Sequence, residues 1–166
     1  TLDLIGRRHT VEQVKDAFYL ARKIGFDNMN MDFIVGLPQE KIEDVKHSME
    51  EALKLNPDSI TIHSLALKRA SRLNIESDYY AHMTMENSNE MMNLTAEYAK
   101  KMKMRPYYLY RQKNMTGNQE NVGYAKEGCE GIYNILMMGD YQDVWAVGAG
   151  AVTKLLSEDR KEAKRI

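Results

Sequence analysis

Apolar residues recur at helical spacing in three stretches of the chain, with charged residues on the opposite faces. The first stretch begins after Thr10, which forms a capping-box pattern with Gln13, and it ends at Gly25, a residue type that commonly terminates helices. The spacing therefore predicts three amphipathic helices, over residues 11–24, 40–55 and 85–104.

Alternating apolar and polar residues predict strands between and after these helices. In residues 28–38 the alternation puts one set of side chains, Met29, Met31, Phe33 and Val35, on one face, and Asn28, Asn30, Asp32 and Ile34 on the other. Residues 59–65 and 107–110 are rich in β-branched or aromatic residues and predict two further strands. Helices and strands that alternate in this way indicate right-handed crossovers and a parallel sheet, and hence an α/β fold.

The last third of the chain departs from this alternation. A stretch rich in Asn, Gly and Glu indicates a loop, and two apolar runs then flank Gly139-Asp140, which is typical of a hairpin turn. Ser157 is placed to cap a short charged helix. The pattern thus predicts a loop over residues 113–131 and a hairpin-like extension whose two arms are residues 132–138 and 141–147. It also predicts a final helix over residues 158–166.

Composition narrows the class of protein. At 166 residues the chain is long enough for one domain with its own core, residues 1–166, and a net charge of −1 argues against a nucleic-acid or polybasic membrane surface. The single cysteine, Cys129, excludes a disulfide framework, and the four histidines do not form a zinc pattern, so no bound metal is expected. The single cysteine also fits a reducing, cytoplasmic setting, and because no apolar run reaches membrane length we expect a soluble protein. The abrupt start at Thr1 leads us to expect a piece of a longer protein.

Asp32 is the first candidate functional residue. It is an acidic residue inside an apolar strand that ends in the turn Gly36-Leu37-Pro38. In a parallel barrel the site lies at the carboxyl ends of the strands, so a carboxylate near such an end predicts a ligand contact. The structural alternative is that Asp32 caps a neighbouring turn or pairs with an arginine.

Two further segments carry candidate chemistry. Gly148-x-Gly150 resembles the beginning of a phosphate loop but lacks the rest of either nucleotide-binding motif. Its small residues would let an adenine or a sugar approach the main chain, or would let the turn pack tightly against the sheet. Arg7-Arg8-His9, before the first helix, is suited to grip a carboxylate or phosphate, or forms a solvated face.

Two sites near strand ends leave alternatives open. His63 lies at the end of the second predicted strand, where it serves as an acid or base, or as a hydrogen-bonded core histidine. The segment 110–124 follows the third strand and offers cations, amides and aromatic rings, which suit an acidic, planar substrate, although an ordinary ordered loop has the same composition. The candidate substrate-binding residues of this segment are Arg111, Lys113, Asn114, Asn121 and Tyr124.

Four motifs together resemble those of one family. Residues 31–38, Met-Asp-Phe-Ile-Val-Gly-Leu-Pro, resemble the family strand Ile-Asp-Leu-Ile-x-Gly-Leu-Pro, and residues 55–58, Leu-Asn-Pro-Asp, resemble its next loop. Residues 147–151 are similar to a Gly-x-Gly-Ala turn, and residues 107–124 to a loop of the clostridial branch. Nearly the whole chain thereby resembles the radical S-adenosylmethionine (SAM) enzymes, specifically the oxygen-independent coproporphyrinogen III oxidase group and its coproporphyrinogen dehydrogenase-like clostridial branch.

The resemblance implies a fold and a cofactor site. The expected fold is the C-terminal part of a partial (β/α) TIM-like barrel. In the family, matching positions contact SAM: an arginine holds a carboxylate, an aspartate accepts from ribose hydroxyls or the amino group, and small or apolar residues contact adenine. The positions implied here are Arg7, Asp32, Ala66 and Val152, with Gly148 and Gly150 beside the last.

The resemblance also implies an activity and the parts needed for it. The family's Cys-x-x-x-Cys-x-x-Cys loop, which holds a [4Fe–4S] cluster, is absent, and Cys129 cannot replace it. Cleavage of SAM, hydrogen abstraction from a propionate of a porphyrinogen and loss of carbon dioxide are thus expected of an intact parent with an electron-donor protein, and the fragment alone is expected to be inactive. No catalytic residue is identified.

Two rival functions fit the same residues. One is a radical SAM-like haem chaperone, which keeps the cluster and binds haem without oxidising it. The other is a non-catalytic half-barrel module that serves only in assembly. A half-barrel has open sheet edges, which predict a homodimer or aggregation of the isolated chain.

Overall fold

The computed structural model describes residues 2, 5–65, 82, 89–110, 120–160 and 162–166. The chain divides into two compact units, Thr1–Glu130 and Gly131–Ile166, and each is described by itself. None of the helices in these described ranges is long and apolar enough to cross a membrane.

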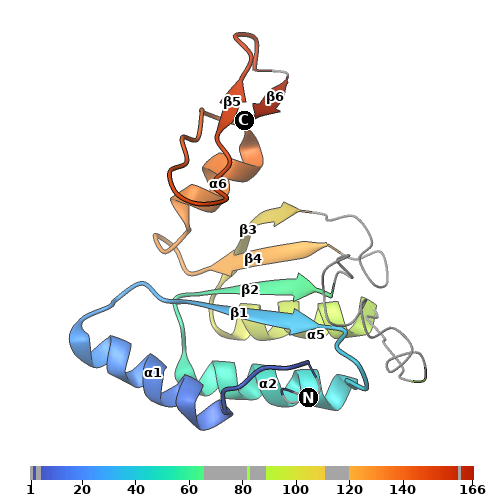
Figure 1. Cartoon of the computed structure of the whole chain (residues 1–166). Helices are drawn as coiled ribbons and strands as arrows, with labels where there is room; N and C mark the ends of the chain where they lie inside the picture. Colours follow the sequence, from blue (N-terminus) through green and yellow to red (C-terminus); the bar gives the residue numbers. More distant parts are fainter. Residues whose placement is uncertain (1, 3–4, 66–81, 83–88, 111–119, 161) are drawn as a thin grey trace. The chain divides into compact units, whose positions relative to one another are not determined.

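The first unit is built on a four-stranded sheet with the order β1-β2-β4-β3. Strands β1 and β2 are parallel, and β4 runs antiparallel to both of its neighbours. The chain order of the elements is visible in Figure 1. Their bounds are α1 Val11–Ile24, β1 Asn30–Val35, α2 Ile42–Leu55, β2 Ser59–Ser64, α5 Asn89–Lys101, β3 Arg105–Tyr110 and β4 Asn121–Ala125.

The three helices predicted from the apolar spacing are present where the structure describes them. In α1 the Thr10 hydroxyl accepts from the Gln13 amide at 3.2 Å, the Gln13 side chain accepts from the Thr10 amide at 2.9 Å, and Gly25 ends the helix with φ 112°. Only the part of the predicted 85–104 helix from residue 89 on lies within the described residues, and most of that part forms α5. The local capping and periodicity signals are therefore confirmed.

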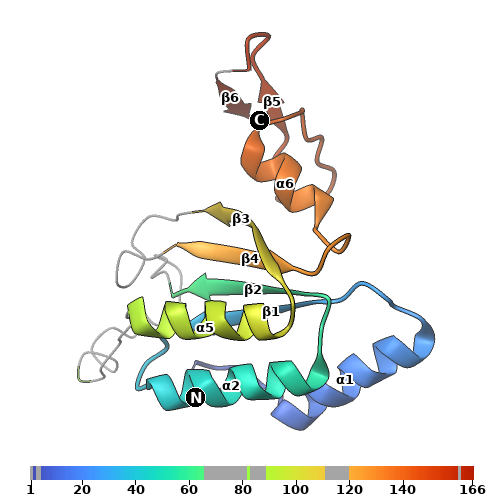
Figure 2. The same cartoon turned by 180° about the vertical axis from the view of Figure 1, so that it is seen from behind.

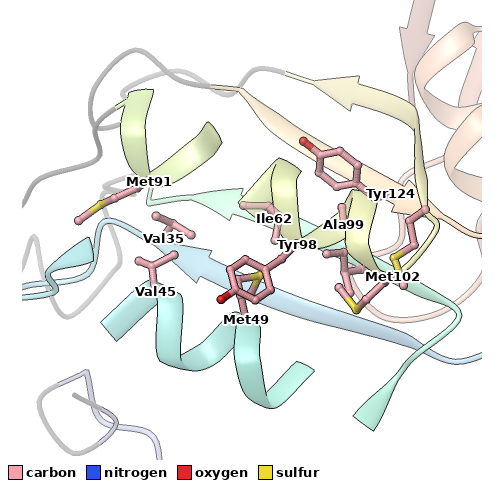
Figure 3. Close-up of a cluster of buried hydrophobic side chains, with 11 residues drawn as sticks. Val35, Val45, Met49, Ile62, Met91, Tyr98, Ala99, Met102 and Tyr124 are labelled. Atoms are coloured by element: carbon pink, nitrogen blue, oxygen red, sulfur yellow. The ribbon is translucent and has the colours of Figure 1, made fainter. Parts of the chain in front are cut away.

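The core lies between one face of the sheet and the helices α2 and α5, which cover that face together (Figures 1 and 2). Figure 3 shows how Val45 and Met49 of α2 meet Tyr98 and Ala99 of α5 over Ile62 of β2. Complete burial of one such large apolar side chain contributes about 1.5–3 kcal/mol. The full cluster is Val35, Val45, Met49, Ile60, Ile62, Met91, Tyr98, Ala99, Met102, Met104 and Tyr124.

Strand β4 corrects two predictions. Residues 121–125 were predicted as part of a loop, yet they form a strand that lies between β2 and β3, so the sheet is mixed and not purely parallel. Val122 and Tyr124 pack on the helix side, whereas Asn121 and Gly123 belong to the other face. Because asparagine and glycine are poor strand formers on their own, the alternation was hidden.

The second unit contains α6 Ile132–Gly139 and the antiparallel pair β5 Lys154–Leu156 and β6 Ala163–Arg165. The prediction of a hairpin around Gly139-Asp140 is wrong, because the first apolar run forms α6 and Asp140 ends it with φ 52°. The predicted final helix is also wrong, since β6 lies within it. Short apolar runs fit a helix or a strand equally well, and here non-local bonds decide: the Lys154 amino group binds the Met137 carbonyl at 2.8 Å and pairs with Asp140.

Candidate functional site

The face of the sheet turned away from α2 and α5, called the open face here, carries the Asp32 side chain. Met31, Phe33 and Val35 of β1 pack toward the core, so the alternate residues project from the open face, as the sequence predicts. Strand pairing aligns Asp32 with Thr61, Thr61 with Gly123 and Gly123 with Tyr108. A single row of side chains therefore crosses all four strands.

Asp32 is held but not enclosed. One carboxylate oxygen accepts from the Asn30 side-chain amide at 2.6 Å, and the other lies 3.5 Å from Nε2 of His63, while 63% of the side chain is exposed. The hydrogen bond with His63 lowers the pKa of Asp32 most; partial burial opposes this, and Asn30 and Thr61 lower it further. The carboxylate therefore stays ionised and accessible.

A cavity of about 740 Å³ lies at the carboxyl ends of β1 and β2. The amino-terminal segment contributes Arg7 and His9 to its wall, and the strands contribute Asp32, His63 and Tyr110. Two of the residues predicted to contact a cofactor, Arg7 and Asp32, thus line the same cavity. The position also agrees with the rule that ligands bind at the carboxyl ends of parallel strands.

The turn after β1 is fixed by a half-buried carboxylate. Glu40 accepts from the amides of Gly36 and Leu37 at 2.7 and 3.1 Å, and Gly36 adopts φ 89°, a conformation that favours glycine. Burial raises the pKa of Glu40, and the two amide bonds work against that rise. Glu40 lines the cavity, and sequence reasoning missed it, although an acid four residues after the glycine was the available signal.

The predicted substrate-binding residues fall into different places. Asn121 lines the cavity and is almost fully buried, and its side-chain oxygen accepts from the Ser64 amide at 2.8 Å, which ties β4 to the end of β2. Tyr124 packs in the hydrophobic core, on the other side of the sheet from Asp32. The remaining predicted contacts lie outside the described residues: Ala66, Arg111, Lys113 and Asn114.

The glycine-rich turn belongs to the second unit. Gly148 and Gly150 adopt φ 124° and 73°, which explains the need for glycine, and Val152 is exposed. The turn lies in the irregular segment between α6 and β5 and does not follow a regular strand. The approach of a ligand to the main chain at these glycines stays a prediction.

Metal ligands do not gather in the part of the chain that the structure describes. No group of three His, Cys, Asp or Glu side chains there is placed to hold a metal ion. Cys129, which follows β4, is half-buried, and its thiol is the single one that the sequence provides. Iron–sulfur clusters are held by several cysteine thiolates, so this chain's residues do not fit such a cluster.

Comparison with known proteins agrees with the resemblance seen in the sequence. A model described as the radical SAM superfamily matches residues 1–52. Over 159 residues the chain is 43% identical to the oxygen-independent coproporphyrinogen-III oxidase-like protein HemZ of Bacillus subtilis, a match that covers 96% of this chain and 32% of that protein. The chain is similar to radical SAM proteins. The predicted family resemblance is thereby confirmed.

Two further comparisons concern this chain. It is 28% identical over 152 residues to the heme chaperone HemW of Bacillus subtilis, covering 90% of this chain and 37% of that protein. The solved structure of the radical SAM enzyme coproporphyrinogen III oxidase (HemN) from Escherichia coli matches with a TM-score of 0.60 at 15% identity, over 92% of this chain and 35% of that one. The predicted α/β class and partial-barrel likeness are confirmed. The chain spans about a third of the length of these relatives.

Proposed function

We propose that this chain forms the SAM-binding part of a radical SAM oxidoreductase that acts on coproporphyrinogen III. The reaction would convert propionate side chains to vinyl groups by oxidative decarboxylation in haem biosynthesis. One structural observation carries the proposal: Arg7 and Asp32, a cation and an accessible carboxylate, line one cavity at the carboxyl ends of parallel strands. The 43% identity to a coproporphyrinogen-oxidase-like protein supports the choice of reaction.

The residues of the cavity fit SAM chemically. An ionised carboxylate only accepts hydrogen bonds, and each Asp32 oxygen keeps a lone pair beyond its contact with Asn30 or His63. Those lone pairs suit ribose hydroxyls or the ammonium group, while the Arg7 guanidinium suits the carboxylate of the methionine part. Bound SAM would supply the oxidising equivalent that removes hydrogen from the substrate.

The cluster chemistry requires more than this chain. Its single cysteine does not provide the thiolates of a [4Fe–4S] cluster, so we propose that other polypeptide supplies them and that this chain alone does not turn over. The complete enzyme would use an electron-donor protein and a porphyrinogen substrate, in the cytoplasm. Among the described residues, β1 and β3 are the outer strands of the sheet, and we propose that the isolated chain dimerises through their edges.

Calorimetric titration of the chain with SAM tests the assignment. We expect the wild-type chain to bind and Asp32→Asn to lose at least about tenfold in affinity, because one charge-assisted acceptor disappears. Asp16→Asn is the matched control, since Asp16 is an exposed aspartate on α1, and it should bind like the wild type. Equal affinities in all three proteins, or no binding by the wild type, would refute the assignment to Asp32.

A heme chaperone is the second candidate, because the HemW match also spans most of the chain. Titration with haem, followed by its Soret absorbance, separates the two functions. Haem binding with a defined stoichiometry and no SAM binding would favour the chaperone. Failure to bind either ligand would favour a non-catalytic half-barrel module.

A further inference from the structure

We infer that a hydrogen-bond relay across the open face of the sheet positions the Asp32 carboxylate for its ligand. The relay begins at Tyr108, passes through Thr61 and Asn30 to Asp32, and is completed from the carboxyl end by His63. The identity of the ligand as SAM rests on the proposed function, whereas the relay rests on the contacts within the sheet.

The direction of the relay follows from the chemistry of its members. Ionised Asp32 can only accept, so the Asn30 group 2.6 Å from it must be the amide NH₂, and the Asn30 carbonyl then faces Thr61. A carbonyl also only accepts, so Thr61 donates toward Asn30 across 3.3 Å, and its hydroxyl also lies close enough to Asp32 to lower the pKa of that carboxyl. The Thr61 oxygen is left as an acceptor for the Tyr108 hydroxyl at 3.5 Å. Every donor therefore points toward Asp32.

Tyr108 reaches Thr61 because the intervening residue is a glycine. Tyr108 belongs to β3 and Thr61 to β2, and Gly123 of β4 lies between them in the same row. A Cβ atom on Gly123 would overlap the Tyr108 ring. Burial raises the pKa of Tyr108, so its hydroxyl keeps its proton and remains a donor at neutral pH. Gly123, a poor strand former, thus permits the contact between Tyr108 and Thr61.

His63 holds the other side of the carboxylate. Its ring is half-buried, lies edge-on to Tyr110 with ring centroids 6.5 Å apart, and places Nε2 3.5 Å from Asp32. With one oxygen of Asp32 bound by Asn30 and the other facing His63, the plane of the carboxylate is fixed. The lone pairs left over suit a ligand with two adjacent donors, such as a vicinal diol or an ammonium group.

Other charged groups also face this cavity and must be followed in any titration. The residues that could contribute to a pH profile are Arg7, His9, Glu40, Asp44, His47 and Tyr110. Of the charged groups, His63 is the one that shifts the pKa of Asp32. The Asp32 carboxyl must therefore be observed directly.

The test compares Thr61→Val, which keeps the shape but removes the hydroxyl, with Thr61→Ser, which keeps it. The readout is the ¹³C resonance of the Asp32 carboxyl carbon as a function of pH, which requires no ligand. We expect Thr61→Val and, to a smaller extent, Tyr108→Phe to raise the titration midpoint of Asp32, and Thr61→Ser to restore it. Tyr19→Phe, at an exposed tyrosine of α1, is the control.

SAM titration of the same variants links the relay to function. Loss of one orienting hydrogen bond should weaken binding about two- to tenfold in Thr61→Val and Tyr108→Phe, with recovery in Thr61→Ser. An unchanged Asp32 midpoint in both relay-breaking variants, with native-like spectra, would overturn the relay. Shifted midpoints in a chain that does not bind SAM would uphold the relay and refute the proposed function. A shift in Thr61→Val but not in Tyr108→Phe would overturn the four-strand relay, because Tyr108 would then have no influence on Asp32.

Discussion

The parallel pair of β1 and β2 has two aspartates, Asp58 at its amino ends and Asp32 facing the cavity at its carboxyl ends. The two differ in their exposure and in their bonding. At the amino ends, Asp58 has a side chain only 13% exposed; it accepts from the Met29 amide at 2.9 Å and pairs with Arg22 at 2.6 Å, with Lys126 3.9 Å away. Asp32, the third of the six residues of β1, lines the cavity at the carboxyl ends; its side chain is 63% exposed and bonds to Asn30 at 2.6 Å and to His63 at 3.5 Å. Asp58 therefore holds parts of the fold together, whereas Asp32 is accessible to a ligand.

The difference separates stability from recognition. Through its three partners Asp58 joins the end of α1, the approach to β1 and the residue after β4, which are distant in sequence. Arg22 also donates to the Asp27 carbonyl at 3.0 Å, and Lys126 to the Asn56 side chain at 2.9 Å. Because its side chain is only 13% exposed, Asp58 presents little surface to a ligand. In barrels of this kind the amino-terminal ends of the strands serve stability and the carboxyl ends serve chemistry.

The largest effect is expected from Asp58→Ala. Removing the carboxylate leaves the Met29 amide and the Arg22 guanidinium without their acceptor, which should lower the free energy of unfolding by about 2–4 kcal/mol. Urea unfolding followed by circular dichroism measures the change. A loss below about 1 kcal/mol would mean that the amino end is not a stability centre.

The reverse phenotype is expected from Asp32→Asn. Its exposed side chain should cost no more than about 0.5 kcal/mol in the free energy of unfolding, while the rise in melting temperature caused by saturating SAM should be lost. Differential scanning fluorimetry with and without SAM gives both quantities in one experiment. If Asp32→Asn destabilised the chain as much as Asp58→Ala, the distinction between the two ends would be wrong.

Sequence reasoning found the elements whose signals are local. The Thr10 cap, the alternation around Asp32 and the spacing of the apolar residues each lie within a few residues, and α1, α2, β1, β2 and β3 follow from them. Strand β4 did not follow, because the reasons for Asn121 and Gly123 lie on other strands: Asn121 satisfies the Ser64 amide, and Gly123 makes room for Tyr108.

The sequence predicts which residues line the site but not the contacts between their side chains. Asp32 stands out in an apolar strand, and the family resemblance points to Arg7, so both could be named from the sequence. The contact with His63 depends on the register of β1 against β2, which pairs Asp32 with Thr61 and Ile34 with His63. A shift of one residue would turn Asp32 into the core. Register is set by the whole sheet, and no local pattern contains it.

Glu40, at the carboxyl end of β1, is a half-buried acid whose contacts are structural. Glu40→Ala leaves the Gly36 and Leu37 amides without an acceptor and should cost about 1–2 kcal/mol, whereas Glu40→Gln keeps an acceptor oxygen and should cost less. The pKa of Glu40 in the folded state is raised above its ordinary 4.5. Protonated Glu40 therefore stabilises the wild type fully below pH 4.5, and this contribution is lost as the pH rises through the folded-state pKa. Relative to wild type, Glu40→Gln should therefore gain stability as the pH rises from 4 to 7, which urea unfolding at several pH values can check.

The smallest effect is expected at Glu51, which pairs with Lys15 and so joins α2 to α1, and which also binds Lys54. The hydrogen bond with Lys15, followed by that with Lys54, lowers the pKa of Glu51 from 4.5 to about 2. A lowered carboxyl pKa stabilises the fold fully above 4.5, and the contribution is lost as pH falls toward 2. Glu51→Gln should therefore flatten the fall in melting temperature between pH 4.5 and 2.5 without altering SAM binding at pH 7. Since this pair is solvated and screened by salt, 0.5 M NaCl should shrink the difference between wild type and Glu51→Gln. The effect of Asp58→Ala should persist in salt, because the hydrogen bond from the Met29 amide to Asp58 is partly buried.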